Sequence, residues 1–195
     1  MSGAISATAS FTGTLSVLES FPSLPDLLPQ SVITIADKTQ EGKLVAAVAQ
    51  PWFDIISLLR SDPAVAFQIP AERWEEIIAG SYRKAGFTEV TLTPRSGDHG
   101  RDVIAVMRGI GSVRVVDQLK AYRPGHLVTA NDVRAFCFVV YADNADKGFM
   151  TTTSDFAPRI PEDPLLKKAI PRRVELINGE KLLDRLKDLV SKGGA

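Results

Sequence analysis

Three polar residues near the middle of the chain have the types and the spacing needed for phosphate chemistry. Asp102 begins one strand-like run, and Gln118 and Lys120 stand two residues apart in the next. Hydrolysis of a phosphodiester needs a divalent cation held by oxygen ligands and a group that polarises the phosphate or positions water. A carboxylate, an amide oxygen and an ammonium group supply these functions. We therefore take these three residues as a candidate catalytic set.

A predicted β-hairpin brings the three side chains together. The runs 101–108 and 112–122 are joined by a Gly-Ile-Gly turn. If the turn centres on its isoleucine, the numbers of facing residues sum to about 220, so Asp102 lies opposite Gln118. Lys120 shares the face of Gln118 because side chains alternate along a strand. Spacing alone thus predicts one polar patch built from two strands.

Glu75 is a fourth candidate, contributed by a helix. A helix predicted over residues 71–85 has an apolar face that includes Trp74 and Ile77, and Glu75 lies on a different side of it. The tertiary fold decides whether Glu75 reaches the patch. A glutamate near the start of a helix is also favoured by the helix dipole, so both interpretations stay open.

The order of predicted elements indicates an α/β fold. From residue 71 the order is α-β-β-β-α-β-α-β-α, and a mixed β-sheet flanked by helices is the natural architecture for it. The predicted elements after the hairpin are a helix at 131–141, a strand at 149–153, a short helix at 164–170, a strand at 174–177 and a final leucine-rich helix.

Residues 1–70 are predicted to form a separate extension in front of a domain at 71–195. Residues 1–29 are rich in Ser, Ala, Thr, Leu and Pro without a sustained period, which is typical of an irregular arm. Apolar residues from 43 to 59 fall near helical spacing around Pro51. We expect one kinked helix or two short helices there.

Composition excludes several classes of protein. The formal net charge is zero, which argues neither for nor against nucleic acid, and the single cysteine, Cys137, rules out an internal disulfide framework. No Lys or Arg precedes Lys38, and no charge-free apolar run approaches the roughly 18 residues of a membrane span. We expect a cytoplasmic protein without a membrane partner.

Five motifs in order resemble the catalytic domain of Mrr-type restriction endonucleases, a branch of the PD-(D/E)xK nuclease superfamily. An aromatic-Glu pair on the first helix, a Gly-Asp-Gly-Gly-(any)-Asp loop into the second strand, a Gln- or Glu-(any)-Lys motif on the third and a Thr-Thr-Ser-(any)-Phe strand end recur in that family. The matching segments here are Trp74-Glu75, Gly86-Phe87, Gly97 to Asp102, Asp117 to Tyr122 and Gly148 to Phe156.

The resemblance implies a restriction-endonuclease-like fold and a set of roles. Asp102, Gln118 and Glu75 would hold the metal ion, normally Mg²⁺ with Mn²⁺ as a substitute, and Lys120 would polarise the scissile phosphate or steer the water. DNA would be the substrate. A homodimer is expected because one site of this type cuts one strand.

Two departures from the family pattern keep alternatives open. His99 stands where the family usually has glycine, and Gln118 replaces the acidic residue of many relatives. A neutral amide holds a hard cation less well than a carboxylate. The patch and the family resemblance make an Mg²⁺-dependent DNA endonuclease of restriction or DNA-processing type the leading hypothesis. Because of Gln118, a noncatalytic nucleic-acid-binding or assembly module with the same fold is the alternative. Preference for a DNA sequence, modification or structure does not follow from the chain.

Other polar residues near the motifs have two interpretations. Thr153 and Ser154 either contact a DNA backbone from a strand end or satisfy amides of the turn. Arg101 and Arg123 stand where DNA would pass, but surface arginines are common. His99 is either a loop residue or a phosphate contact.

Overall fold

The β4–β5 hairpin is the centre of a seven-stranded sheet in the computed structural model, which describes residues 22–94 and 100–191. The strand order follows the chain, β1-β2-β3-β4-β5-β6-β7. Neighbouring strands are antiparallel from β1 to β5, and β5, β6 and β7 are parallel. The strands are β1 Ile33–Lys38, β2 Lys43–Val48, β3 Glu89–Leu92, β4 Val103–Arg108, β5 Ser112–Lys120, β6 Lys147–Thr152 and β7 Val174–Ile177.

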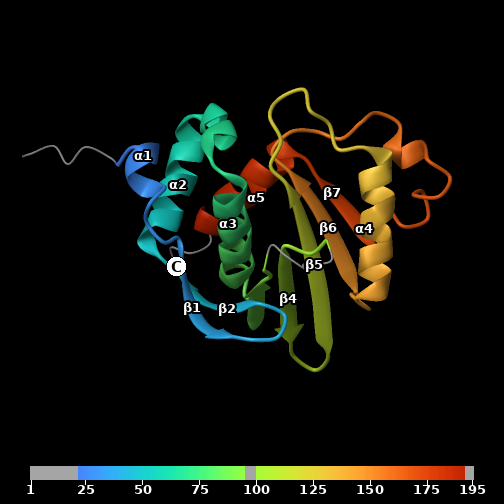
Figure 1. Cartoon of the computed structure of the whole chain (residues 1–195), viewed down its shortest axis with the longest axis horizontal. Helices are drawn as coiled ribbons and strands as arrows, with labels where there is room; N and C mark the ends of the chain where they lie inside the picture. The colour runs from blue at the N-terminus through green and yellow to red at the C-terminus, as the bar shows by residue number, and fades with distance from the viewer. Residues whose placement is uncertain (1–21, 95–99, 192–195) are drawn as a thin grey trace, which may run out of the picture.

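Helices cover both faces of the sheet, as the α/β prediction requires (Figure 1). On one face of the sheet, α3 packs on β2 to β5, and α5 packs on β6 and β7. On the same side, α2 packs against α5. On the other face, α4 lies against β6. The helices are α1 Leu24–Leu27, α2 Gln50–Ser61, α3 Ala71–Lys84, α4 Ala130–Ala142 and α5 Gly179–Ser191, with 3₁₀ turns at Pro63–Gln68 and Ile160–Glu162.

The larger core lies between the sheet and helices α2, α3 and α5. Trp52 and Trp74 are fully buried there, and their indole N–H groups donate to the carbonyls of Ile77 and Ala66, each at 3.0 Å. Burial of the bulky rings is therefore not opposed by unpaired polar atoms. The apolar face predicted for the helix at 71–85 is confirmed.

The smaller core lies between the sheet and α4. Thr129 and Asp132 form the capping box that begins this helix, with bonds of 3.3 Å and 2.8 Å between side chain and backbone. Gly148 on β6 lets the helix approach closely, because a Cβ there would lie 2.9 Å from Phe136 Cε1 and would also overlap Val140. The position of α4 over β6 depends on this contact.

The helix predicted for residues 43–59 is only half right. Residues 50–61 form α2, but residues 43–48 form β2, which pairs with β1 and β3. The apolar residues from 44 to 48 suit either period, and pairing with β1 on one side and β3 on the other stabilises the strand. Gly42 makes the turn before β2 with φ +147°, where a Cβ would overlap the carbonyl oxygen of Leu92 and lie 2.9 Å from its carbonyl carbon. The extension therefore adds a hairpin to the sheet.

Two further differences concern irregular segments. The short helix predicted for residues 164–170 is wrong, because this segment forms successive turns in which Asp163 accepts from the amides of Leu165 and Leu166. Within the predicted irregular arm, residues 24–27 form α1, and residues 1–21 lie outside the described part of the chain. Across the ranges that the structure describes, no helix combines the length and apolar character needed to cross a membrane.

Candidate active site

The register of the β4–β5 hairpin is the predicted one. Val103 pairs with Asp117 and Met107 with Val113, so the numbers of facing residues sum to 220. The amide of Asp102 donates to the carbonyl of Asp117 at 2.9 Å, which extends the pairing by one residue. Asp102 therefore stands at the start of β4 opposite Gln118, as spacing predicted.

The carboxylate of Asp102 is held against β5. The amide of Leu119 donates to Asp102 Oδ2 at 2.6 Å. The carbonyl of Asp102 accepts from the amide of Thr93 at 3.0 Å and from its hydroxyl at 3.1 Å. These bonds fix both the backbone and the side chain of Asp102 between β3 and β5. A preorganised carboxylate of this kind is suited to metal binding.

The side chain of Gln118 packs beneath the loop that leads into β4. A Cβ placed on Gly100 would lie 3.2 Å from Gln118 Nε2 and 3.2 Å from Val139 Cγ2 of α4. Gly100 also has φ +80°, which favours glycine. Loop, strand and helix thus meet around the amide. His99 and the rest of the segment 95–99 lie outside the described residues.

Lys120 ends β5 on the same side of the sheet as Gln118. Its carbonyl accepts from the hydroxyl of Thr152 at 2.7 Å, which fixes the strand end to β6. Burial of Asp132 raises the pKa of that carboxyl, but hydrogen bonds from Thr129 and the positive charges of Lys120 and His126 outweigh it and lower the pKa. The positive charge of Lys120 therefore favours the ionised form of Asp132 in the first turn of α4.

Glu75 approaches from the opposite helix layer. It lines a groove of about 420 Å³ together with Thr93 and Pro94. Because Thr93 is bonded to Asp102, Glu75 stands beside the backbone that carries the candidate ligand. The structure brings Asp102 and Gln118 together within the hairpin, whereas Glu75 lies on α3 in the groove that it shares with Thr93.

Asp117 points away from this patch, as strand alternation predicted. Its side chain is 1% exposed on the α3 and α5 face, where it accepts from the Tyr82 hydroxyl at 2.8 Å and the Thr151 hydroxyl at 2.9 Å. Burial raises its pKa to about 6, against the charge of Arg185 and these two hydrogen bonds. Asp117 is therefore a buried polar group behind the candidate site.

The donors around Asp102 fit a magnesium ion that is completed by a substrate. Among residues 22–94 and 100–191, no group of three or more His, Cys, Asp or Glu side chains could hold a metal ion. Mg²⁺, however, is commonly bound by one or two carboxylates together with water and phosphate oxygens. Asp102 with the amide oxygen of Gln118 would meet that minimum, and Glu75, in the groove beside Thr93, would be a second carboxylate.

Two polar residues left open by the sequence have structural partners. Arg101 pairs with Asp143, the residue that caps the C-terminus of α4, and the Arg101 side chain is 17% exposed. The hydroxyl of Thr153 donates to the carbonyl of Tyr122 at 2.7 Å, so its partner is a carbonyl of the segment after β5 and not an amide of its own turn. The pairing of Arg101 was missed because Asp143 is 42 residues away, and no local pattern marks it.

The chain matches a known protein family over most of its length. The family profile described as restriction endonuclease, Mrr_cat, matches residues 67–186, which is more than half of the chain. The chain belongs to the Mrr-type restriction endonuclease family. The matched region includes α3, the hairpin and β6, and it leaves the β1–β2 hairpin and α2 outside. The resemblance and fold class inferred from the sequence are confirmed.

Two solved restriction endonucleases are similar in fold to this Mrr-type chain. One is MspJI in complex with a 27-mer oligonucleotide, at 22% identity and TM-score 0.43; the match covers 74% of this chain and 32% of that one. The other is the DNA modification-dependent enzyme AspBHI, at 16% identity and TM-score 0.45, with 82% and 40% covered. The chain thus spans about a third to two fifths of these proteins. No curated protein matches it.

Proposed function

We propose that this restriction-endonuclease-type domain is an Mg²⁺-dependent DNA endonuclease. One observation carries the proposal: the Asp102 carboxylate is fixed by the Leu119 amide at 2.6 Å, directly across the hairpin from Gln118. Lys120 follows one strand repeat further on the same face. A carboxylate, an amide oxygen and an ammonium group would therefore face the same side of the sheet at one end of the hairpin.

The residues divide the work of phosphodiester hydrolysis. Asp102 and Gln118 hold the cation, with Glu75 as accessory carboxylate. When bound, Mg²⁺ supplies positive charge to the scissile phosphate and lowers the pKa of attacking water. Lys120 steers that water or polarises the phosphate, since an ammonium group is a compact donor of three hydrogen bonds. Mn²⁺ is expected to replace Mg²⁺, because both accept oxygen ligands.

DNA is the proposed substrate on the strength of the family. The exposed Arg123 and His126 follow Lys120 in the loop before α4, where a duplex backbone would pass. Cleavage of both strands would require two copies of the site, so we expect a homodimer. Sedimentation of the protein with and without duplex DNA measures this, and a monomer on DNA would contradict it.

Cleavage of several DNA forms tests the proposal. Supercoiled, linear, methylated and branched DNA are incubated with wild type and Lys120→Met in Mg²⁺, Mn²⁺ or EDTA. We expect metal-dependent products with wild type that are absent with the variant. No product from any form, together with no difference between the proteins, would overturn the proposal.

The second candidate function is a noncatalytic nucleic-acid-binding or assembly module. It is favoured by Gln118, which gives the second strand a neutral ligand in place of an acidic one. This candidate predicts DNA binding that is unaffected by EDTA and by Gln118→Glu. Gain of cleavage in Gln118→Glu from an inactive wild type would identify a decayed nuclease site.

A further inference from the structure

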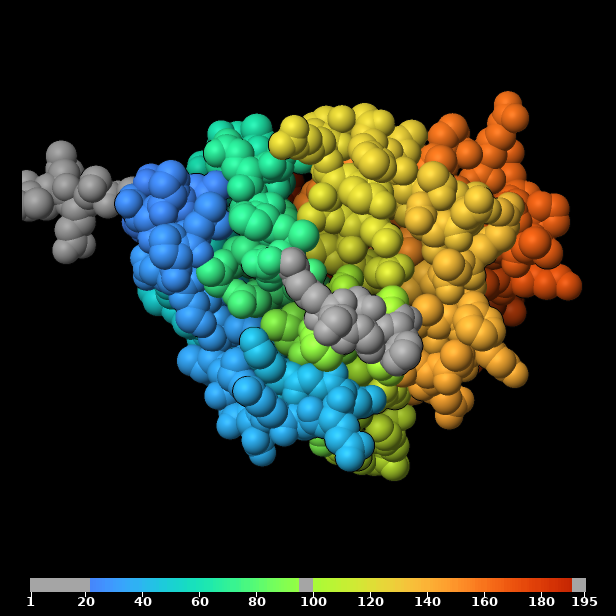
Figure 2. Space-filling view, viewed as in Figure 1, coloured from blue at the N-terminus to red at the C-terminus, as the bar shows by residue number. Residues whose placement is uncertain are grey.

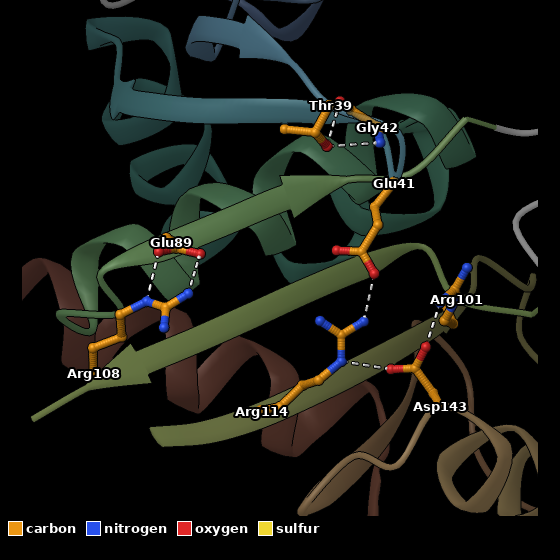
Figure 3. A network of polar contacts seen from close by, with 8 residues as sticks. All are labelled: Thr39, Glu41, Gly42, Glu89, Arg101, Arg108, Arg114 and Asp143. Carbon is orange, nitrogen blue, oxygen red and sulfur yellow. Dashed lines mark hydrogen bonds and ion pairs between the residues drawn. The ribbon is translucent and has the colours of Figure 1, made fainter. Parts of the chain in front are cut away.

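A chain of ion pairs connects the N-terminal hairpin with the residue that precedes Asp102 (Figure 3). Glu41, at the turn between β1 and β2, accepts from Arg114 Nη2 of β5 at 2.7 Å. Arg114 Nε donates to Asp143 Oδ2 at 2.8 Å, and the other oxygen of Asp143 accepts from Arg101. Four segments that are distant in sequence meet in this network.

The inner part of the network is the stronger part. The side chain of Asp143 is 8% exposed, whereas those of Arg114 and Glu41 are 25% and 45% exposed. Burial raises the pKa of Asp143, but hydrogen bonds and charges of Arg114 and Arg101 outweigh it and hold the pKa below its ordinary value. Hydrogen-bonded ion pairs gain strength as solvent is excluded, so the outer pair with Glu41 contributes least.

The network acts on the loop that carries the candidate metal ligand. Arg101 is covalently joined to Asp102, and its guanidinium is tied to the C-terminal cap of α4 through Asp143. Gly100 packs against Val139 of the same helix. The loop entering β4 is thereby held from the α4 side, while the Leu119 amide holds the Asp102 carboxylate from β5.

The N-terminal hairpin lies outside the matched family region yet reaches this network. In the space-filling view the light-blue hairpin lies against the yellow-green β4–β5 hairpin (Figure 2). Glu41 is 73 residues before Arg114, so the sheet extension by β1 and β2 is what brings them together. The extension is therefore in physical contact with the machinery of the proposed site.

We propose that Asp143 and Arg114 are positioning residues that fix Arg101, and through it Asp102, in the geometry of the proposed nuclease site, with Glu41 of the N-terminal hairpin as outer support. This inference rests on the proposed function for its consequence in catalysis. Partners that orient metal ligands typically change metal affinity or activity by about 10–100-fold when they are removed. A rigid support one residue from a ligand belongs to this class of partner.

A matched control exists on the same sheet. Glu89 and Arg108 form a two-bond ion pair of 2.6 Å and 3.1 Å, also drawn in Figure 3. This pair joins β3 and β4 near the Gly-Ile-Gly turn, at the opposite end of β4 from Asp102. Glu89→Gln therefore removes a charge and an ion pair from the sheet without touching the loop of the site.

The test compares Asp143→Asn and Arg101→Gln with Glu89→Gln. Arg101→Gln leaves Asp143 paired with Arg114, which protects the fold if Asp143→Asn unfolds. Hydrogen exchange at the amides of Asp102 and Leu119 reports the positioning directly and needs no activity. Cleavage as a function of Mg²⁺ concentration reports the consequence, and urea unfolding shows that each variant is folded.

We expect exchange at both amides to rise by about tenfold or more in Asp143→Asn and Arg101→Gln, and not in Glu89→Gln. Cleavage should fall by about tenfold or more, with a higher Mg²⁺ concentration at half-maximal rate, and Asp143→Glu should restore part of it. Unchanged exchange in the folded variants, or an equal rise in Glu89→Gln, overturns the proposal. If exchange rises but wild type cuts no DNA, the positioning holds and the proposed function fails.

Discussion

The buried carboxyl of Asp117 is predicted to make the fold less stable as pH rises. Burial raises its pKa from the ordinary 3.8 to about 6, against the charge of Arg185 and hydrogen bonds from Tyr82 and Thr151. Between these two values the unfolded chain loses a proton that the folded chain keeps, so the contribution of Asp117 to stability is greatest below pH 3.8 and is lost completely above about pH 6. A difference of about 2.2 pH units at 1.36 kcal/mol each gives about 3 kcal/mol, of which about 2 kcal/mol falls between pH 4.5 and 7.5.

Asp117→Asn isolates this contribution. The amide keeps an acceptor for the Tyr82 hydroxyl, and any cost of depriving Arg185 of a counter-charge is the same at every pH used, because an arginine stays protonated. Urea unfolding of both proteins is followed by fluorescence of Trp52 and Trp74 at pH 4.5, 6 and 7.5 in EDTA, so that no metal ion adds charge.

The variant should gain about 2 kcal/mol relative to wild type between the lowest and the highest pH. In the wild type, the hydrogen bond from Tyr82 lowers the pKa of Asp117. Tyr82→Phe removes this bond, so the pKa should rise further and stability should fall more steeply with pH than in the wild type. The reasoning is refuted if the stability difference between Asp117→Asn and wild type is flat across this range. It is equally refuted if wild type gains on the variant as pH rises, because Arg185 would then hold the carboxylate ionised.

Three further predictions concern the hairpin and its supports. Lys120→Met should abolish cleavage while leaving the urea unfolding midpoint unchanged, since the ammonium acts on the phosphate and is half-buried at a strand end; retained cleavage would remove Lys120 from the site. Gly148→Ala should lower the free energy of unfolding in urea by about 1–3 kcal/mol, because a methyl group would overlap Phe136 and Val140. Gly111→Ala is the control: no atom lies within 4 Å of the added carbon, so it should change stability little. Thr153→Val should cost about 1–3 kcal/mol of stability by leaving the Tyr122 carbonyl unpaired, with unchanged DNA affinity in a gel-shift titration; weakened binding without destabilisation would assign Thr153 to the DNA contact instead.

The hairpin was predictable because its information is local. The Gly-Ile-Gly turn fixes the register, and alternation then decides which of Asp117 and Gln118 faces the patch. The boundaries of α3 followed in the same way from its apolar period and Gly86. These features depend on residues that are close in sequence.

Long-range pairing explains what the sequence did not reveal. Residues 43–48 fit a helix locally but pair with β1 along their length, and Lys43 and Leu44 also pair with Leu92 and Thr91 of β3, far along the chain. The bond network of Asp143 likewise joins residues from four segments, and no spacing rule marks it. The relation of Glu75 to Thr93 depends on how α3 lies across the sheet, which periodicity leaves undetermined.

Single-turnover cleavage of supercoiled plasmid by wild type and Asp102→Asn, with Mg²⁺ and with EDTA, tests the central claim most directly. Asparagine keeps an oxygen for the Leu119 amide and removes the charge that would hold the ion. We predict Mg²⁺-dependent nicking or linearisation by wild type, none in EDTA, and a loss of at least about a hundredfold in the variant, with DNA binding retained. Equal cleavage by the two proteins, or cleavage that persists in EDTA, would contradict an Mg²⁺-dependent nuclease centred on Asp102.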